Sequence, residues 1–354
     1  MRISEFSTKK YLKGLSLKQL QEYVESVGMQ PYRAKQLFHW MYRKNVSNFS
    51  AMTTLKKSVR ESLEPYAEIN LLKLSQSNSS KYEPTTKFLF ELLDGNLVET
   101  VFMEADNRKT ICLSSQVGCA LKCGFCATGL MGFIRNLTAG EIVDQVLMAE
   151  RSMGQEATNI VMMGMGEPFL NYDPVIQAAY LISDPEGIAI SKRKITISTS
   201  GLIPTIIRYA DEGHRFKLAI SLNGTTQEIR RKLMPLTKKY PLDALLKAAK
   251  YYTDLSKTRV TFEYILLDKI NDTKDDAARL RKLLHEIPCK INLIPYNATE
   301  FGFVPSSEAR IQEFVAALVS FHGPVTVRRS KGRDINAACG QLYVEKLKTK
   351  ATLN

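Results

Sequence analysis

The stretch that decides the fold is Cys119-Ala120-Leu121-Lys122-Cys123-Gly124-Phe125-Cys126, in which three cysteines lie within eight residues. Three thiolates this close in sequence can bind three irons of a cubane iron–sulfur cluster and leave the fourth iron open. A cluster used only for electron transfer normally has a fourth cysteine ligand. An open iron therefore indicates a place where a substrate or cofactor binds.

The alternatives for these cysteines are a structural zinc ion and ordinary packing in the core. Structural zinc sites usually contain C-x2-C pairs and four ligands. The chain's four histidines, any of which could supply a fourth ligand, are His39, His214, His285 and His322. None of them lies close to the cysteines in sequence, so the spacing favours a four-iron cluster.

The composition is typical of a soluble globular protein. The 354 residues are 44% apolar and 24% charged, which predicts one large domain or one large and one small. No apolar run approaches the roughly 20 residues that span a bilayer, and the N-terminus lacks the apolar core of a signal peptide. Six cysteines, three of them clustered, fit a reducing compartment. We expect a cytoplasmic protein with no membrane partner.

Positive charge is concentrated at the two ends of the chain. Residues 1–65 carry 12 Lys and Arg against 5 Asp and Glu, and residues 325–354 carry 7 against 2, within a net charge of +13. A merely soluble basic protein would spread its charge more evenly, so we expect both ends to contact nucleic acid. The candidate phosphate ligands, each of which is also compatible with an ordinary surface charge, are Lys9, Lys10, Arg33, Lys35, Arg43, Lys44, Arg328, Arg329, Lys331 and Arg333.

Residues 1–65 are predicted to form a small basic helical domain that binds RNA. The first helix begins at Ser16 and is closed by Gly28, the second begins at Pro31, and the third covers Met52–Leu63. Helical modules with Lys and Arg on their outer faces often hold a nucleic-acid backbone. The ordinary alternative is a charged face that only contacts solvent.

Residues 66–104 predict a β-hairpin linker, since two strand-like runs flank the turn signal Asp94-Gly95. Residues 105–354 then repeat a strand-then-helix pattern. The expected strands are Thr110–Gln116, Ile160–Met163, Lys194–Ser198, Leu218–Ser221, Val260–Leu266 and Lys290–Pro295. The expected helices are Thr138–Met153, Pro174–Ile182, Leu202–Glu212, Leu242–Asp254, Lys274–Glu286 and Ser307–Phe321. Such β/α units predict an α/β core with a parallel sheet, either a partial barrel or a doubly wound sheet.

Polar and glycine-rich segments follow the predicted strands, at the ends where parallel α/β folds bind ligands. The cysteine run follows the first strand. The later segments are Gly164-Met165-Gly166-Glu167-Pro168, Ser198-Thr199-Ser200-Gly201, Ser221-Leu222-Asn223-Gly224 and Pro295-Tyr296-Asn297. Ser198 and Asn223 can hydrogen-bond a ribose or a carboxylate, and Asn297 can reach an adenine edge. Taken singly, each also fits ordinary capping and turn chemistry.

Several stretches together carry a specific resemblance to one family. They are Cys112-Leu113-Ser114-Ser115-Gln116-Val117-Gly118-Cys119, Met162-Met163-Gly164-Met165-Gly166-Glu167-Pro168, Ser191-Lys192-Arg193 and Asp334-Ile335-Asn336-Ala337-Ala338-Cys339-Gly340-Gln341-Leu342. With the cysteine spacing, the set resembles the RlmN/Cfr family of radical S-adenosylmethionine (SAM) RNA methyltransferases over nearly the full chain. It is closer to the RlmN branch, which methylates carbon 2 of an adenine, than to the Cfr branch, which methylates carbon 8.

The resemblance implies a partial (β/α)6 TIM-like barrel of the radical SAM type, preceded by the helical domain and the hairpin. It implies a [4Fe–4S] cluster on Cys119, Cys123 and Cys126, whose open iron is chelated by SAM. The SAM contacts it implies are Gly166, Glu167, Ser198, Ser221, Leu222, Asn223 and Asn297. The expected partners are 23S rRNA and transfer RNA, with a reducing electron donor such as flavodoxin, and we expect a monomer.

The resemblance also implies a route through two further cysteines, because this adenine C–H is too weak a nucleophile to attack the methyl group of SAM. Cys339 would accept a methyl group from one SAM, and a 5′-deoxyadenosyl radical from a second SAM would activate that methyl group to add to the base. Glu99 would remove the ring proton. Cys112, as thiolate, would release the product by forming a Cys112–Cys339 disulfide. The ordinary alternatives are a solvent-facing Glu99 and buried core cysteines, which is our interpretation of Cys289.

Two rival functions stay open at this point. One is a Cfr-type enzyme that methylates carbon 8 of adenine. The other is an RNA-binding protein with a purely structural metal site and no catalysis. In an enzyme of either branch the target base must leave its stack, which costs a few kcal/mol and can be offset by phosphate contacts.

Overall fold

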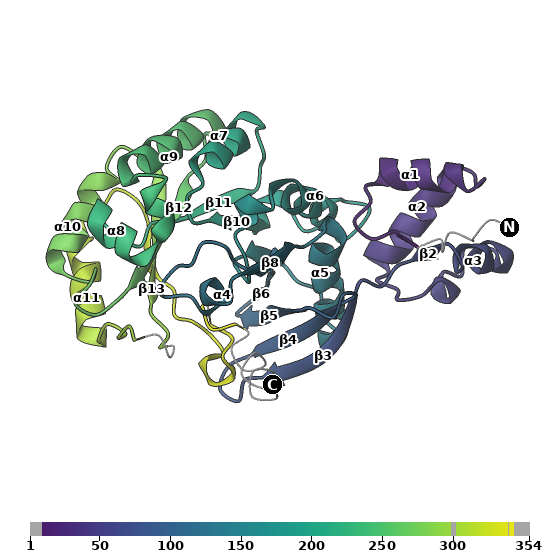
Figure 1. Ribbon diagram of the computed structural model, residues 1–354, viewed down its shortest axis with the longest axis horizontal. Helices are drawn as coiled ribbons and strands as arrows, with labels where there is room; N and C mark the ends of the chain where they lie inside the picture. Colours follow the sequence, from purple (N-terminus) through teal and green to yellow (C-terminus); the bar gives the residue numbers. More distant parts are fainter. Residues whose placement is uncertain (1–8, 299–301, 339, 343–354) are drawn as a thin grey trace, which may run out of the picture.

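The computed structural model describes residues 9–298, 302–338 and 340–342. Its centre is a ten-stranded sheet in the order β14-β13-β12-β11-β10-β9-β6-β5-β4-β3 (Figure 1). The parallel strands are β6 (Arg108–Cys112), β9 (Asn159–Met162), β10 (Ile195–Thr199), β11 (Lys217–Ser221), β12 (Val260–Leu266), β13 (Cys289–Pro295) and β14 (Val325–Val327). Side chains from β5 through β14 line one common cavity, so the sheet curves into a partial barrel and is not doubly wound.

Helices that alternate with the strands cover the outside of the barrel (Figure 1). They are α5 (Ala139–Met153), α6 (Tyr172–Ser183), α7 (Ile203–Asp211), α9 (Leu242–Ser256), α10 (Lys274–Leu283) and α11 (Glu308–Ala317). Their apolar faces pack on the sheet, as the expected β/α repeats required. Within the described ranges, no helix is long and apolar enough to cross a bilayer.

The predicted strand Thr110–Gln116 is correct only in its first part, because Thr110–Cys112 lies in β6 and the chain leaves the main sheet after Cys112. A separate strand, β7 (Gln116–Gly118), pairs instead with β8 (Phe133–Asn136). Polar side chains cause the break. Gln145 accepts a hydrogen bond from the Ser114 backbone N–H at 2.9 Å, and this bond replaces a sheet contact.

The hairpin around Asp94-Gly95 forms as predicted, between β4 (Thr85–Leu92) and β5 (Leu97–Ala105). Gly95 has φ +78°, a left-handed conformation that glycine adopts without a steric penalty. An additional strand, β3 (Leu72–Ser79), pairs with β4 but was not predicted, because its side chains are almost all exposed and polar. Since β5 pairs with β6, the hairpin continues the core sheet.

The N-terminal helices form a separate lobe beside α5 and α6 (Figure 1). The lobe contains α1 (Leu17–Ser26), α2 (Tyr32–Phe38) with a π-helical continuation His39–Arg43, and α3 (Lys57–Leu63), together with the short paired strands β1 (Lys10–Tyr11) and β2 (Ala67–Glu68). Ser16 and Gln19 make a reciprocal capping box, which confirms the predicted start of the first helix. The third helix is shorter than predicted. Asn48 caps a separate 3-10 turn, Phe49–Ala51, ahead of it.

A buried ion pair attaches this lobe to the barrel. The Lys13 Nζ lies 2.5 Å from Asp144 Oδ1 in α5, and both side chains are fully buried. The second oxygen of Asp144 accepts hydrogen bonds from the backbone N–H groups of Leu71 and Leu72. One carboxylate therefore holds the start of the lobe, near Lys13, and the segment by which the chain leaves it, at Leu71 and Leu72.

The segment 328–338 closes the side of the barrel between β14 and the hairpin. Gly332 N donates to Glu83 Oε2 at 2.5 Å, and Lys87 Nζ donates to Asn336 O at 3.3 Å. Asp334 accepts a hydrogen bond from the Ser80 hydroxyl at 2.7 Å. The strand at one edge of the sheet is thereby joined to the hairpin at the other.

We predict that Lys13→Met lowers the free energy of unfolding by about 3–5 kcal/mol, because it leaves the Asp144 carboxylate buried without its counter-charge. Urea denaturation followed by circular dichroism measures the change. Lys57→Met is the matched control, since the Lys57–Glu61 pair is largely exposed and contributes little. Equal stability of Lys13→Met and the parent protein would show that the buried pair does not hold the lobe.

Candidate active site

The three clustered cysteines lie in a loop between β7 and the short helix α4 (Ala127–Leu130). Cys123 is buried, whereas Cys119 and Cys126 are half-buried. Cys119 N donates to Gly132 O at 2.8 Å, and Cys126 N donates to Cys123 O at 3.1 Å, so the loop is held by its own backbone. All three side chains line a cavity of about 160 Å³ at the carboxyl ends of the strands.

The environment of these thiols fits a bound cluster. Burial raises the pKa of Cys119 to about 12 and also raises that of Cys123, so the thiolates need nearby positive charge such as iron supplies. Among the described residues, no three His, Cys, Asp or Glu side chains converge so as to hold a single metal ion. Cluster ligands need no such convergence, because each thiolate binds its own iron. The arrangement of the three thiols is therefore compatible with a cluster.

The glycine-rich segment after β9 is bonded to the chain that leads into the cysteine loop. Gly164 N donates to Leu113 O at 3.0 Å, and Met165 N donates to the Ser114 hydroxyl at 2.9 Å. A Cβ at Gly164 would lie 2.7 Å from Leu113 O, so only glycine allows this approach. The two segments hold the cofactor cavity from adjacent strands.

Glu167 carries the carboxylate of this segment and lines the cavity. Its two oxygens accept hydrogen bonds from Phe169 N at 3.1 Å and Ser200 N at 2.8 Å. Burial raises the pKa of this carboxyl group, and the hydrogen bonds oppose that rise. Glu167 thus ties the segment to the end of β10.

Most of the predicted SAM contacts converge on one cavity. Its lining contains Gly166, Glu167, Ser198, Ser221 and Asn223 together with the three cysteines. Leu222 does not line it, because its side chain is fully buried in the core. Asn297 does not line it either, and its Nδ2 donates to Ser330 Oγ at 2.7 Å.

Asn223 forms hydrogen bonds with other parts of the protein. Its Oδ1 accepts a hydrogen bond from Ile265 N at 3.0 Å, and its backbone is left-handed with φ +54°. Its backbone carbonyl accepts a hydrogen bond from Asn271 Nδ2 at 2.9 Å. The side chain holds the loop after β11 against β12.

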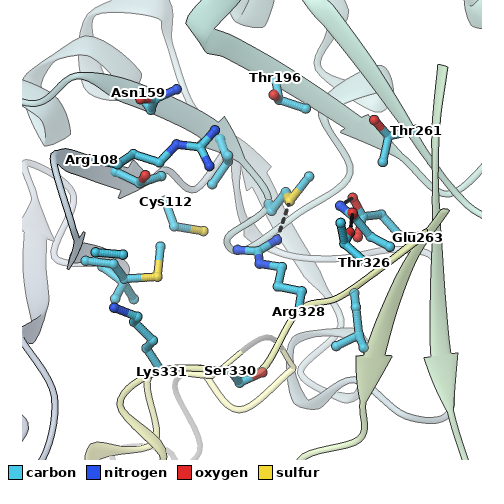
Figure 2. A pocket seen from close by; sticks show the side chains of 18 of the residues that line it. Arg108, Cys112, Asn159, Thr196, Thr261, Glu263, Thr326, Arg328, Ser330 and Lys331 are labelled. Atoms are coloured by element: carbon cyan, nitrogen blue, oxygen red, sulfur yellow. Dashed lines mark hydrogen bonds between the residues drawn. The ribbon is translucent and has the colours of Figure 1, made fainter. Parts of the chain in front are cut away.

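A larger cavity of about 440 Å³ fills the inside of the barrel (Figure 2). Cys112, at the end of β6, lines it with its side chain. The residues that line both cavities are Met163, Glu263, Ile294 and Arg328, so the two spaces meet. A group bound beside the clustered cysteines would therefore face the space that contains Cys112.

Glu99 is buried in β5 and is not solvent-facing. It lies on the same face of the strand as Val101 and Met103, which line the larger cavity. Its Oε1 lies 3.1 Å from the ammonium group of Lys87, which is also buried. The carboxylate therefore lies in a buried ion pair at the wall of the larger cavity.

Cys339 lies outside the described residues. Its neighbours in sequence line the two cavities, Ala338 the larger one and Gly340 the smaller one. No disulfide joins two of the described cysteines. A bond between Cys112 and Cys339 therefore stays a prediction. Cys289 is buried in β13 and lines neither cavity, in agreement with its assignment as a core residue.

Sequence reasoning missed Arg230, a fully buried arginine in α8 (Gln227–Leu233). Its guanidinium donates to Ser200 O at 2.6 Å and to Leu222 O at 3.1 Å, which joins the ends of β10 and β11. Burial lowers its pKa to about 10. No local pattern separates it from the exposed Arg231 and Lys232, so no signal in the sequence could have identified it.

Arg328 was predicted as a candidate phosphate ligand, which stays a prediction, but its side chain is half-buried and not on the outer surface. Figure 2 shows it inside the larger cavity, where its Nη1 donates to Met163 Sδ at 3.3 Å. Glu263 lines the same cavity opposite it, and the positive charge of Arg328 lowers the pKa of this carboxyl against the rise caused by burial. One Glu263 oxygen has no hydrogen-bond partner among the described residues.

Comparison with known proteins identifies the family. The "Ribosomal RNA large subunit methyltransferase N-terminal domain" family matches residues 11–69, and the Radical SAM superfamily matches residues 113–281. The dual-specificity RNA methyltransferase RlmN of Geobacter sulfurreducens is 44% identical over 332 residues, covering 94% of this chain and 91% of that protein. The chain belongs to the RlmN family of radical SAM enzymes. The probable dual-specificity RNA methyltransferase RlmN of Thermoanaerobacter sp. (strain X514) is 42% identical, with coverage of 95% and 98%.

A solved structure agrees with the RlmN assignment. A radical SAM methyltransferase from Sphaerobacter thermophilus has a TM-score of 0.90 and 44% identity, covering 94% of this chain and 98% of that one. The partial barrel implied by the family resemblance is confirmed. Radical SAM enzymes of the RlmN family use a [4Fe–4S] cluster and SAM, which are therefore the cofactors of this chain.

We predict that Gly118→Ala greatly lowers the iron bound per chain after anaerobic reconstitution. A Cβ there would lie 1.9 Å from Gly132 O, the acceptor of the Cys119 N–H, and Gly118 has φ +73°. Overpacking of this kind costs roughly 1–3 kcal/mol and displaces the loop. Gly132→Ala is the matched control, with φ +75° but open space around the added carbon. Equal iron loss in both variants would contradict a role for the Gly118 contact.

Proposed function

We propose that this chain methylates carbon 2 of an adenine in 23S rRNA and in some transfer RNAs. As a member of the RlmN family it is a SAM-dependent RNA methyltransferase, and relatives named dual-specificity RNA methyltransferases support both substrates. The observation that carries the proposal is that Cys112 lines a cavity that joins the cavity of the clustered cysteines. The proposal includes a cytoplasmic location, a monomer, and an electron donor such as flavodoxin.

The proposed roles follow from where the side chains lie. The residues around the smaller cavity would hold the cluster and SAM, which would supply the methyl group and the radical chemistry when bound. Cys339 carries the methyl group to the base, and the positions of Ala338 and Gly340 support this role. Glu99, whose Oε1 lies 3.1 Å from the Lys87 ammonium group, accepts the ring proton.

Cys112 completes the reaction in this proposal. Its thiolate attacks the Cys339 sulfur, so that an S–S bond forms as the bond from that sulfur to the RNA-linked carbon breaks. The bonding electrons leave with the RNA, and the released carbon takes up a proton to become the methyl group. Cys112 lies at the inner end of the larger cavity and is only 6% exposed. This position supports a reaction with a bound base and not with a molecule in solvent. A structural metal site without catalysis is not compatible with membership of the RlmN family. Methylation at carbon 8 is the remaining competitor.

The carbon that is methylated is tested directly. Anaerobically reconstituted protein, SAM, a chemical reductant and an unmodified transfer RNA transcript should yield 2-methyladenosine, identified by mass spectrometry of the digested RNA. Glu99→Gln should lower the rate by about 10²–10⁴-fold through loss of the proton acceptor. A product that is mainly 8-methyladenosine would overturn the proposal.

We predict that Cys112→Ala accumulates protein covalently joined to RNA, because the thiol that releases the product is gone. Denaturing gel electrophoresis with labelled RNA detects the joined species. Adding Cys339→Ala to Cys112→Ala should abolish it, whereas Cys289→Ala, another buried cysteine, should turn over normally. Recovery of only free RNA and free protein from Cys112→Ala would remove Cys112 from this step.

A further inference from the structure

The larger cavity has a cationic rim at the amino ends of the strands, opposite the clustered cysteines. The rim consists of Arg108 at the start of β6, Lys194 immediately before β10, Lys217 at the start of β11 and Lys290 at the start of β13. The first three are exposed and Lys290 is half-buried. In the part of the chain that the structure describes, none of the four forms an ion pair with a carboxylate.

These cations repel one another. Burial lowers the pKa of Lys217, and the charges of Lys290 and Arg108 lower it further. Like charges around one opening create a positive potential that attracts an anion. Glu263, a carboxylate that interacts electrostatically with Lys290, lines the same cavity. The net charge of residues 66–324 gave no sign of this cluster, because acidic residues elsewhere in the segment balance its positive charge.

The cavity wall between this rim and Cys112 can hydrogen-bond a base. It presents hydroxyl and amide side chains from β9, β10, β12 and β14, namely Asn159, Thr196, Thr261 and Thr326 (Figure 2), and Asn292 of β13 also lines it. A volume of about 440 Å³ lies in the range of ordinary ligand pockets. Cys112, Glu263 and Arg328 lie at the inner end, where this cavity meets the cofactor cavity.

The N-terminal lobe reaches the same end of the barrel. Asn45 donates to Leu147 O at 2.7 Å and accepts a hydrogen bond from Arg151 at 2.7 Å, in the last turns of α5. The chain runs from there into Asn159, which lines the cavity. The exposed side chains of Arg43 and Lys44 therefore lie on the rim side. Arg43, Lys44 and Arg151 line a surface hollow there together with Glu150 and Glu156, so the lobe adds cations to this side within a surface of mixed charge.

We propose that the target nucleotide reaches the active site through the amino-end opening of the barrel, and that Arg108, Lys194, Lys217 and Lys290 bind the RNA phosphates that flank it. The inference rests on the proposed function, since it assumes an RNA substrate. A base turned out of its helix passes down the polar wall to Cys112, while its backbone phosphates stay at the rim. SAM occupies the opposite end, so the two substrates do not compete for one opening.

The test is the binding of an unmodified transfer RNA transcript to the reconstituted protein with SAM, measured by fluorescence anisotropy over a range of KCl concentrations. Lys217→Glu combined with Lys290→Glu should weaken binding about tenfold or more and reduce the slope of log K against log salt by about 2. Iron content and SAM affinity should equal those of the parent. Both positions lie at strand starts on the rim, so folding is preserved, and circular dichroism checks this.

The matched control is Lys232→Glu combined with Lys238→Glu, an equal charge change on exposed residues of the other rim. Both lysines follow β11 in the chain. Arg230, two residues before Lys232, donates hydrogen bonds to the backbone at the carboxyl ends of β10 and β11, which places this segment on the other rim. The control should bind RNA within about twofold of the parent, since it touches no phosphate in this route.

Parent-like affinity and salt slope in the Lys217/Lys290 variant would overturn the proposal, and so would equal weakening in the control. This binding test and the product analysis under the proposed function can fail independently of each other. If the parent makes no methyladenosine, but the rim variant loses RNA binding and the control does not, the proposed RNA route is supported and the proposed methylation reaction is contradicted. If 2-methyladenosine forms and the rim variant binds RNA as the parent does, the proposed methylation reaction is supported and the proposed RNA route is contradicted.

Discussion

The hydrogen bonds of Ser114 hold the parts of the active site in register. Its hydroxyl donates to Glu99 O at 2.6 Å and accepts from Met165 N at 2.9 Å, while its backbone exchanges hydrogen bonds with the buried Gln145 side chain. One residue thus connects the strand of the proposed base, the glycine-rich cofactor segment and helix α5. Because every one of these groups is buried, leaving any of them without a partner would cost free energy, and the arrangement is correspondingly rigid. Cys112 and the cysteine loop lie on either side of Ser114 in sequence, so their positions depend on it.

The two ends of the barrel carry different side chains and open into different cavities. Parallel strands bring their carboxyl ends to one rim, where the clustered cysteines and Glu167 surround the smaller cavity. The amino ends form the other rim, which is cationic and opens into the larger cavity. Glu263 and Arg328, opposite in charge, lie where the cavities meet. The inside of the barrel is filled by side chains in most TIM folds but contains a cavity of about 440 Å³ here, which is the space that the proposed route requires.

Local patterns in the sequence predicted a large part of the architecture. Ser16 with Gln19, and Asp94 with Gly95, act through bonds between near neighbours, so capping and turn rules apply to them directly. The apolar runs of the buried parallel strands were equally clear. Strand β3 was missed because a mostly exposed edge strand lacks such a run. The end of β6 was misplaced because a distant side chain, Gln145, competes for its backbone.

The sequence by itself determined the chemistry: three cysteines spaced for a cluster, a glycine-rich segment one β/α unit later, and the family to which both belong. These features depend on residue type and on short spacing, which survive without any knowledge of distant contacts. Only the tertiary structure decided which charges are buried. Lys13, Arg230 and Arg328 look like surface cations in sequence but face the interior, whereas four cations scattered between residues 108 and 290 meet at one opening. Burial and like-charge proximity arise when strands far apart in the chain pack side by side, and no local pattern encodes that.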